Sequence, residues 1–212
     1  MIDLNDLLEQ VWPMATQQAI PTESVSLNNA LGRVLAQDVF SSLNVPQHDN
    51  SGMDGYAVCC TDIQPSRRFQ VSQRVPAGAS PQPLQPGTVA RIFTGAPIPP
   101  GADSVVMQED VVVNDDGSVT FSALPKSGQW IRRAGEDIAS GQVVLSQGTR
   151  LDAIHVGLLA SIGVPTVSVN RRLKVGVMVT GSELQSPGQL LQPGQIYNSN
   201  EYVWCGLLEA MH

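Results

Sequence analysis

The chain has 212 residues, of which 42% are hydrophobic and 15% are charged, so it can form one large domain or roughly two to three small ones. Its formal net charge of −7 argues against a general binder of nucleic acid or of acidic membranes, because affinity for phosphate comes from Lys and Arg. A small anionic ligand remains compatible with this charge, since backbone N–H groups and a few local arginines are enough to bind one.

Helical spacing of apolar residues opens the chain. Residues 3–15 predict an amphipathic helix, and the acidic start MIDLNDLLEQ is unlike a signal or transit peptide. Pro21 ends this region, and residues 24–39 predict a short strand, a turn of helix and another strand.

The pattern changes between about residue 49 and residue 137. Short β-type pieces alternate there with turns, in a chain that contains 15 prolines and 19 glycines. The segment NDDGS, residues 114–118, predicts a hairpin turn. We therefore expect this section to form a small β-barrel or sandwich that is inserted into the first unit.

Helical spacing returns at residues 148–164 and stops at Gly163 and Pro165. Residues 175–179, VGVMV, predict a strand that is covered on both faces, and a last helix is expected to begin near residue 199 or 200. One strand and one helix cannot cover each other on all sides, and the chain stops at His212, where a second parallel strand is due. We therefore expect the N-terminal portion of a longer protein.

Two kinds of feature are not indicated by the sequence. The most apolar window, residues 153–169, is interrupted by His155 and Pro165, whereas a membrane-spanning helix needs about 20 apolar residues. Cys59 and Cys60 are adjacent and Cys205 is distant, which fits neither metal-ligand spacing nor a disulfide framework. These patterns predict a protein of the reducing cytoplasm, without a membrane partner.

Four polar segments contain the residue types that build binding sites. They are DNSGMDGYAV (49–58), RIFTGAPIPPGADSVVMQED (91–110), WIRRAGEDI (130–138) and VMVTGSEL (177–184). The last follows a predicted strand, and ligands in open α/β sheets bind at the carboxyl ends of strands. A Thr-Gly pair allows close approach of the backbone, and nearby carboxylates suit Mg²⁺ and a phosphate-bearing substrate.

Each segment alone also has an ordinary interpretation. Thr94-Gly95 and Thr180-Gly181 are compatible with simple turns. Glu136 and Asp137 are compatible with a solvated corner paired to Arg132 and Arg133, which would contribute little to stability. His155 fits the edge of a core better than a catalytic role. A function has to come from the combination of segments.

In this order and spacing, together with PGQIYNSN (193–200), the four segments closely resemble the molybdopterin molybdenumtransferase family, the MoeA-like proteins that include the E domain of gephyrin. The resemblance implies the insertion of molybdate into adenylylated molybdopterin with release of AMP, and Mg²⁺ as cofactor. It also implies a cytoplasmic homodimer that works with other molybdenum cofactor biosynthesis proteins and not with nucleic acid.

The resemblance also implies a multi-domain α+β fold. Residues 1–48 and 138–170 would form an elongated domain of helices and strands that links and dimerises. Residues 49–137 would form the inserted β-barrel-like domain. Residues 171–212 would begin an α/β molybdopterin-binding domain, which is incomplete here.

Site residues follow from the same match. Asp54 and Glu183 are implied in catalysis and as the metal ligands. The residues implied in substrate binding are Thr94, Gly95, Asp137, Thr180, Gly181 and Ser182. Residues 49–51 are expected to shape the loop that carries Asp54.

Two positions depart from the family pattern, because Ser182 and Asn198 stand where the family has acids, which removes negative charge near the expected cation site. The alternative function is a non-catalytic dimerisation or scaffold module, or an inactive remnant of the family. The residues Asp54, Thr94, Asp137 and Glu183 are retained, which favours the enzyme for the parent protein, because a pure scaffold has no need of acids around a cleft. The 212-residue chain alone is expected not to turn over.

Overall fold

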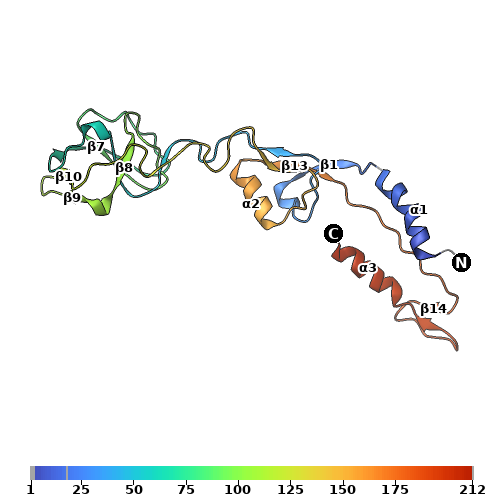
Figure 1. The fold of residues 1–212 in the computed structure, drawn as a ribbon. Helices are drawn as coiled ribbons and strands as arrows, with labels where there is room; N and C mark the ends of the chain where they lie inside the picture. Colours follow the sequence, from blue (N-terminus) through green and yellow to red (C-terminus); the bar gives the residue numbers. More distant parts are fainter. Residues whose placement is uncertain (1–2, 18, 212) are drawn as a thin grey trace. The chain divides into compact units, whose positions relative to one another are not determined.

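The computed structural model describes residues 3–17 and 19–211 (Figure 1). The described chain forms two compact units. One contains the residues up to Val39 together with those from Leu145 onward, and the other, which we call the middle unit, is Phe40–Val144. The three predicted domain ranges remain a prediction. Residues 1, 2, 18 and 212 of these ranges lie outside the described residues.

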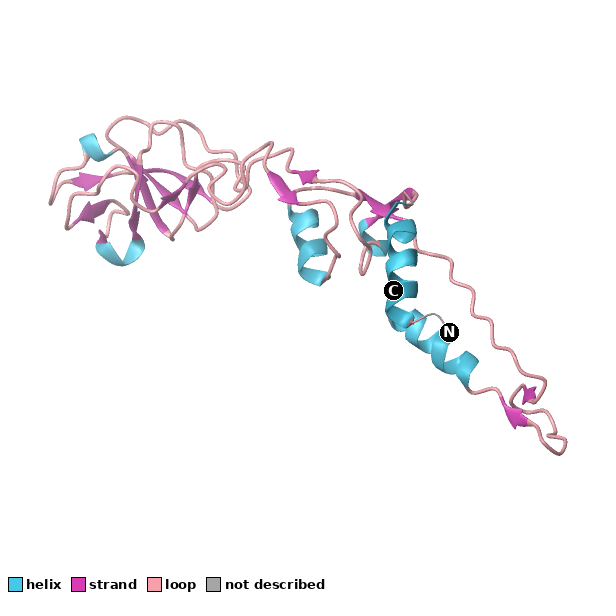
Figure 2. Ribbon diagram, turned by 45° about the vertical axis from the view of Figure 1, so that its right-hand side comes forward, coloured by secondary structure: helices cyan, strands magenta, loops and turns pink. Residues whose placement is uncertain are grey.

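The middle unit is built from short strands (Figures 1 and 2). A four-stranded sheet has the order β6-β7-β4-β8, with β4 at Gly55–Val58, β6 at Val71–Val75, β7 at Val89–Ile92 and β8 at Ser104–Met107. A three-stranded sheet has the order β5-β10-β9, with β5 at Arg68–Phe69, β9 at Val111–Val113 and β10 at Val119–Phe121. A further pair joins β3 (Asn50–Ser51) to β11 (Ile131–Arg132). A 3-10 turn, η2, lies at Cys60–Asp62.

The described strands of this unit form separate sheets, so the predicted closed barrel is not confirmed. The 3-10 turn η3 (Gln108–Asp110) lies between β8 and β9, where the chain leaves one sheet and enters the other. A buried cluster with members from both sheets includes Tyr56, Phe69 and Phe121. Two layers that share one core match the sandwich alternative.

Strand β4 lies at the centre of the unit's hydrophobic packing. Tyr56 and Val58 belong to the cluster shared with the second sheet, whereas Ala57 belongs to a second cluster with Val75 and Ile92. The alternation follows from the period of two in a strand, which sends successive side chains to opposite faces. All four residues of β4 are buried, so this strand is held from both sides.

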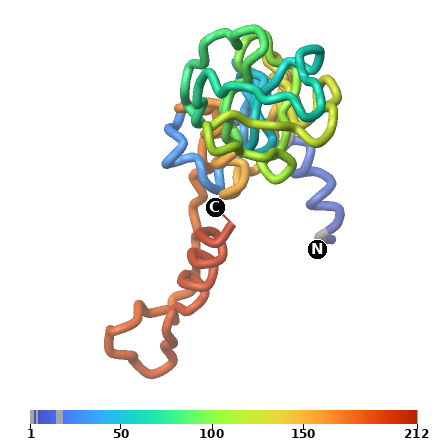
Figure 3. The backbone as a smooth tube through the Cα atoms, turned by 90° about the vertical axis from the view of Figure 1, so that its left-hand side faces the viewer, coloured from blue at the N-terminus to red at the C-terminus, as the bar shows by residue number. Residues whose placement is uncertain are grey.

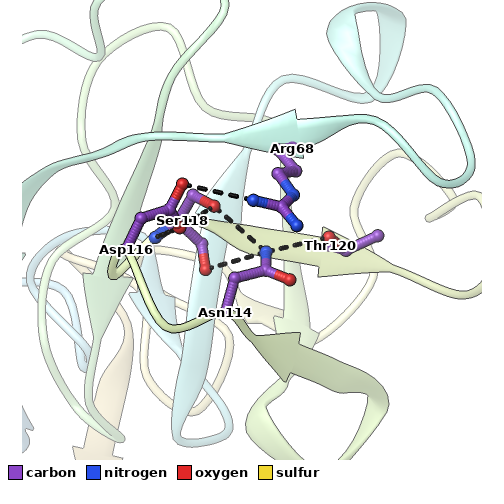
Figure 4. Close-up of polar contacts among 5 residues, drawn as sticks. All are labelled: Arg68, Asn114, Asp116, Ser118 and Thr120. Atoms are coloured by element: carbon purple, nitrogen blue, oxygen red, sulfur yellow. Dashed lines mark hydrogen bonds and ion pairs between the residues drawn. The ribbon is translucent and has the colours of Figure 1, made fainter.

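The predicted hairpin at residues 114–118 is confirmed (Figure 4). The backbone N–H of Asn114 donates to the carbonyl of Ser118 over 2.8 Å, and the Asn114 amide donates to the hydroxyls of Ser118 and Thr120. Asp116 Oδ1 accepts from the N–H and the hydroxyl of Ser118, and these two donors lower the pKa of Asp116. Arg68 on β5 reaches Asp116 Oδ2 over 3.4 Å. The turn residues therefore satisfy one another locally.

The other unit contains the predicted helices. Helix α1 is Leu4–Gln17, and β1 (Thr22–Ser26) leads into the 3-10 turn η1 (Leu27–Asn29) and pairs antiparallel with β13 (Thr166–Asn170). Helix α2 (Ala153–Ser161) begins at Asp152, whose carboxylate accepts from the N–H of His155 while the His155 ring accepts from the N–H of Asp152. His155 thus completes a helix cap. The short strands β2 (Val39–Phe40) and β12 (Val143–Leu145) lie where the chain passes from one unit to the other.

The predicted strand at residues 175–179 is wrong. No strand is formed there, and the side chains of Val175 and Met178 are 54% and 87% exposed. The described residues offer this segment no strand to pair with, and an unpaired extended chain leaves its N–H and C=O groups to water. The start of a covered α/β domain is therefore not confirmed.

After this segment the chain forms one closed loop and a helix, drawn in orange to red in Figure 3. Strand β14 (Leu184–Gln185) pairs in parallel with β15 (Ile196–Tyr197), and α3 (Asn200–Ala210) follows as predicted. Among the described helices, none has the length and apolar character needed to cross a membrane.

Candidate functional site

Asp54 and Thr94 form the centre of the candidate site. Asp54 precedes β4 and Thr94 follows β7, and the antiparallel register that pairs Gly55 with Ile92 brings these two strand ends together. Thr94 donates twice to Asp54 Oδ1, from its N–H over 2.8 Å and from its hydroxyl over 2.7 Å. These two donors lower the pKa of Asp54, so the carboxylate stays ionised to a lower pH than an ordinary aspartate. No described residue donates to its second oxygen, Oδ2.

Two glycines shape this pair of strand ends. A Cβ on Gly55 would lie 1.9 Å from the carbonyl oxygen of Val106, so β4 and β8 can approach this closely only because the side chain is absent. Gly95 has φ +79°, a left-handed conformation that favours glycine, and its N–H donates to the carbonyl of Ser51 over 2.9 Å. The glycines of the MDGYA and TGAP motifs are therefore required by backbone geometry next to the Asp54–Thr94 pair.

Arg91 braces the same region and was missed by the sequence analysis. Its guanidinium donates to the carbonyl of Gly55 over 2.8 Å and to Gln108 Oε1 over 2.6 Å, and it lies 4.6 Å from the ring centre of Phe93. The N–H of Gln108 in turn donates to the carbonyl of Asp54 over 3.0 Å. The positive charge of Arg91 contributes to the lowered pKa of Asp54. An arginine inside the apolar strand VARI was the available signal.

The residues before Asp54 hold neighbouring loops. Asp49 accepts from the N–H of Ala134 over 2.9 Å and pairs with Arg133 over 2.6 Å. The Ala134 N–H and the Arg133 side chain lower the pKa of Asp49 against the opposing effect of burial. Ser51 donates its hydroxyl to the carbonyl of Met53 over 2.5 Å. These contacts agree with the expectation that this stretch shapes the loop leading to Asp54.

Asp137 lies in the same unit but is not joined to Asp54 or Thr94 by any hydrogen bond or ion pair of the described residues. Both of its carboxylate oxygens accept from Arg132 Nη2, over 2.6 and 2.7 Å, and both side chains are half exposed. Glu136 lies 3.8 Å from Arg132 Nε. Glu136 and Asp137 therefore form the solvent-exposed corner given above as the ordinary interpretation, with Arg132 as their partner. The side chain of Arg133 pairs with Asp49 instead.

Residues 180–183 belong to the other unit and are exposed. The Glu183 carboxylate lies over the backbone of Gly181, since a Cβ on that glycine would be 2.7 Å from Oε1, and the Glu183 carbonyl accepts from the N–H of Ile196 over 2.8 Å. The structure thus brings Asp54, Thr94 and Gly95 together in the middle unit, whereas residues 180–183 belong to the other unit. Within the described residues, three or more His, Cys, Asp or Glu side chains nowhere converge on a possible metal position.

Comparison with known proteins identifies the family. Residues 2–163 match the family model described as the MoeA N-terminal region, domains I and II. The chain belongs to this family. The molybdopterin molybdenumtransferase of Haemophilus influenzae is 48% identical over 97% of the chain and 50% of its own length, and that of a Nostoc species is 42% identical over 89% of the chain and 44% of its own length.

The fold of this MoeA N-terminal region is also found in a solved structure. The crystal structure of a molybdopterin biosynthesis MoeA protein from Pyrococcus horikoshii superimposes with a TM-score of 0.85 at 34% identity, covering 95% of the chain and 54% of that protein. The motif resemblance is therefore confirmed. The chain spans about half the length of the relatives it matches.

The two departures from the family pattern are placed differently. Ser182 is exposed in the loop before Glu183. Asn198 stabilises the start of α3, because its Oδ1 accepts from the N–H of Glu201 over 3.3 Å and its Nδ2 donates to Glu201 Oε2 over 2.9 Å. The amide of Asn198 therefore both accepts and donates a hydrogen bond at the start of α3.

Proposed function

We propose that this chain forms the N-terminal half of a molybdopterin molybdenumtransferase, which inserts molybdate into adenylylated molybdopterin and releases AMP in molybdenum cofactor synthesis. The observation that carries the proposal is the Asp54–Thr94 pair, two motif residues that the fold holds together with one carboxylate oxygen left open. Glu183, with Thr180, Gly181 and Ser182, would supply substrate contacts from the α/β part, and Asp137 would orient the substrate.

The lowered pKa of Asp54 narrows its chemical role. A carboxylate that remains ionised at neutral pH is a poor proton acceptor, because general bases work best with a pKa near the working pH. It suits the binding of a cation or of a substrate donor instead. Mg²⁺ commonly uses one or two carboxylates together with substrate phosphates and water, so Asp54 Oδ2 fits a metal held largely by the substrate.

The proposal is tested by Asp54→Asn in the full-length protein, with formation of active molybdenum cofactor from purified substrates as the readout. We expect a loss of about 100-fold or more, as is typical when a preorganised electrostatic contact is removed. Asp115→Asn, in the hairpin turn of the same unit, is the control and should leave activity unchanged. Full activity of the Asp54 variant would refute the assignment.

A scaffold or inactive remnant is the second candidate, because Ser182 stands where the family has an acid. We expect the 212-residue chain to be inactive by itself.

We also propose that the parent is a cytoplasmic homodimer that meets other cofactor biosynthesis proteins. The exposed apolar residues Leu7, Leu8 and Val11 on α1 support such self-association. Sedimentation of the chain with and without Leu8→Glu measures this, and an unchanged monomer in both cases would contradict it.

A further inference from the structure

Four arginines that are distant in the sequence converge on one cavity of about 340 Å³ in the unit that contains β1 and β13. They are Arg33, Arg150, Arg171 and Arg172. Backbone pairing brings them together, because Val34 forms a bridge with Arg150, and the N–H of Asn170 donates to the carbonyl of Val34 over 2.8 Å.

The positive charge at this cavity is only partly balanced. Arg33 pairs with Glu23 over 2.5 Å and donates to the carbonyl of Asn170 over 2.8 Å. Arg150 donates to a backbone carbonyl in the last turn of the described chain over 3.3 Å. The exposed side chains of Arg171 and Arg172 make no hydrogen bond or ion pair with any described residue. In a chain with 12 basic residues and a net charge of −7, this local excess of cations favours an anion.

The remaining wall of the cavity is apolar. It is formed by Ile20, Val34, Leu173, Val175, Leu208 and Met211, together with Gly32 and Asn170. Small-molecule sites have volumes of roughly 300–1,000 Å³ and combine apolar walls with a few placed polar groups. A ligand that fills this space needs an anionic group for the arginines and an apolar body for the wall.

We propose that this cavity binds a small organic phosphate, with the phosphoryl group on Arg171 and Arg172 and the apolar body against Leu208 and Met211. The planar guanidinium group pairs with phosphate through two parallel hydrogen bonds, and it stays charged at every physiological pH. A phosphate monoester carries close to two negative charges, whereas a carboxylate carries one. The phosphate therefore matches a cluster of guanidinium groups better. The cavity belongs to the unit that does not contain Asp54 and Thr94, and this inference does not depend on the proposed function.

The test is calorimetric titration of the 212-residue chain at low ionic strength with phenyl phosphate as the probe. Inorganic phosphate and phenol serve as comparison ligands, because each retains one half of the probe. We expect phenyl phosphate to bind saturably and more tightly than either half. Absence of saturable binding at millimolar concentration, or equal binding of inorganic phosphate, would overturn the assignment of an organic phosphate.

The matched variants are Arg171→Gln/Arg172→Gln at the cavity and Arg67→Gln/Arg68→Gln in the middle unit, which remove the same charge. We expect the first pair to weaken phenyl phosphate at least about tenfold, given the strength of charged hydrogen bonds, and the second to leave it unchanged. Equal weakening by both pairs would show unspecific charge attraction and refute the site. Arg150→Gln provides an independent variant, and circular dichroism checks that each protein is folded.

Discussion

Two apolar segments of the chain have opposite outcomes. In the middle unit, β7 is paired on both sides, by β6 and β4, and its residues Val89, Ala90 and Ile92 are fully buried. Residues 175–179 are also apolar, yet they form no strand, and the side chains of Val175 and Met178 are exposed. Apolar composition therefore produces a strand only where neighbouring strands satisfy the backbone and another layer covers the side chains.

Hydrogen exchange gives the largest contrast between these regions. In the 212-residue chain we expect the amides of β4 and β7 to exchange about a thousandfold or more slowly than those of residues 175–179, because opening of a folded core costs several kcal/mol. No amide of residues 172–183 donates a hydrogen bond within the described structure. Comparable protection of both segments, measured by NMR or mass spectrometry, would remove the contrast.

Truncation of a core side chain should distinguish the regions by the free energy of unfolding. Phe121 is buried, and its ring lies 5.6 Å from that of Phe69, so we expect Phe121→Ala to cost about 3–5 kcal/mol. Leu190→Ala is the control, because this leucine is 91% exposed, and we expect a change within about 0.5 kcal/mol. Urea denaturation measures both, and similar costs would contradict the assigned burial.

A single methyl group tests the close approach of β4 to β8. We expect Gly55→Ala to destabilise the middle unit by about 3 kcal/mol, because the new Cβ meets a backbone carbonyl that no side-chain rotation can move. Gly157→Ala in α2 is the matched control, since nothing lies within 4 Å of its Cβ position, and it should stabilise the helix by up to about 1 kcal/mol. Thermal unfolding measures the stability of both variants. An unchanged stability of Gly55→Ala would refute the prediction.

The smallest effect concerns pH. The pKa of Asp54 is below its ordinary value of 3.8, so its contribution to stability is complete above that pH and is lost as the pH falls further through the folded-state pKa. Thr94→Val removes the hydroxyl donor, and we expect the pKa of Asp54 to rise toward 3.8 in a carboxyl NMR titration. The difference in free energy of unfolding between the unsubstituted chain and Thr94→Val should then shrink below pH 3.8. An unchanged pKa of Asp54 in Thr94→Val would contradict the role of Thr94.

Local elements were predictable because short-range chemistry specifies them. The hairpin at residues 114–118 closes through its own Asn, Asp and Ser side chains, and α2 begins where Asp152 caps it. The positions of Asp54 and Thr94 were available from the motif resemblance. Their contact was not, because it depends on the register of two strands separated by more than thirty residues.

The sequence by itself determined the family, the local elements and the residue types of the candidate site, since these depend on neighbours along the chain and on motif identity. Tertiary structure alone decided that Thr94 donates two hydrogen bonds to Asp54, that Arg91 braces both strands, and that residues 175–179 remain unpaired. It also decided that four arginines meet at one cavity. The physical reason is the same in each case: pairing partners, burial and charge neighbours are set by contacts between distant segments, and these contacts exist only after the chain has folded.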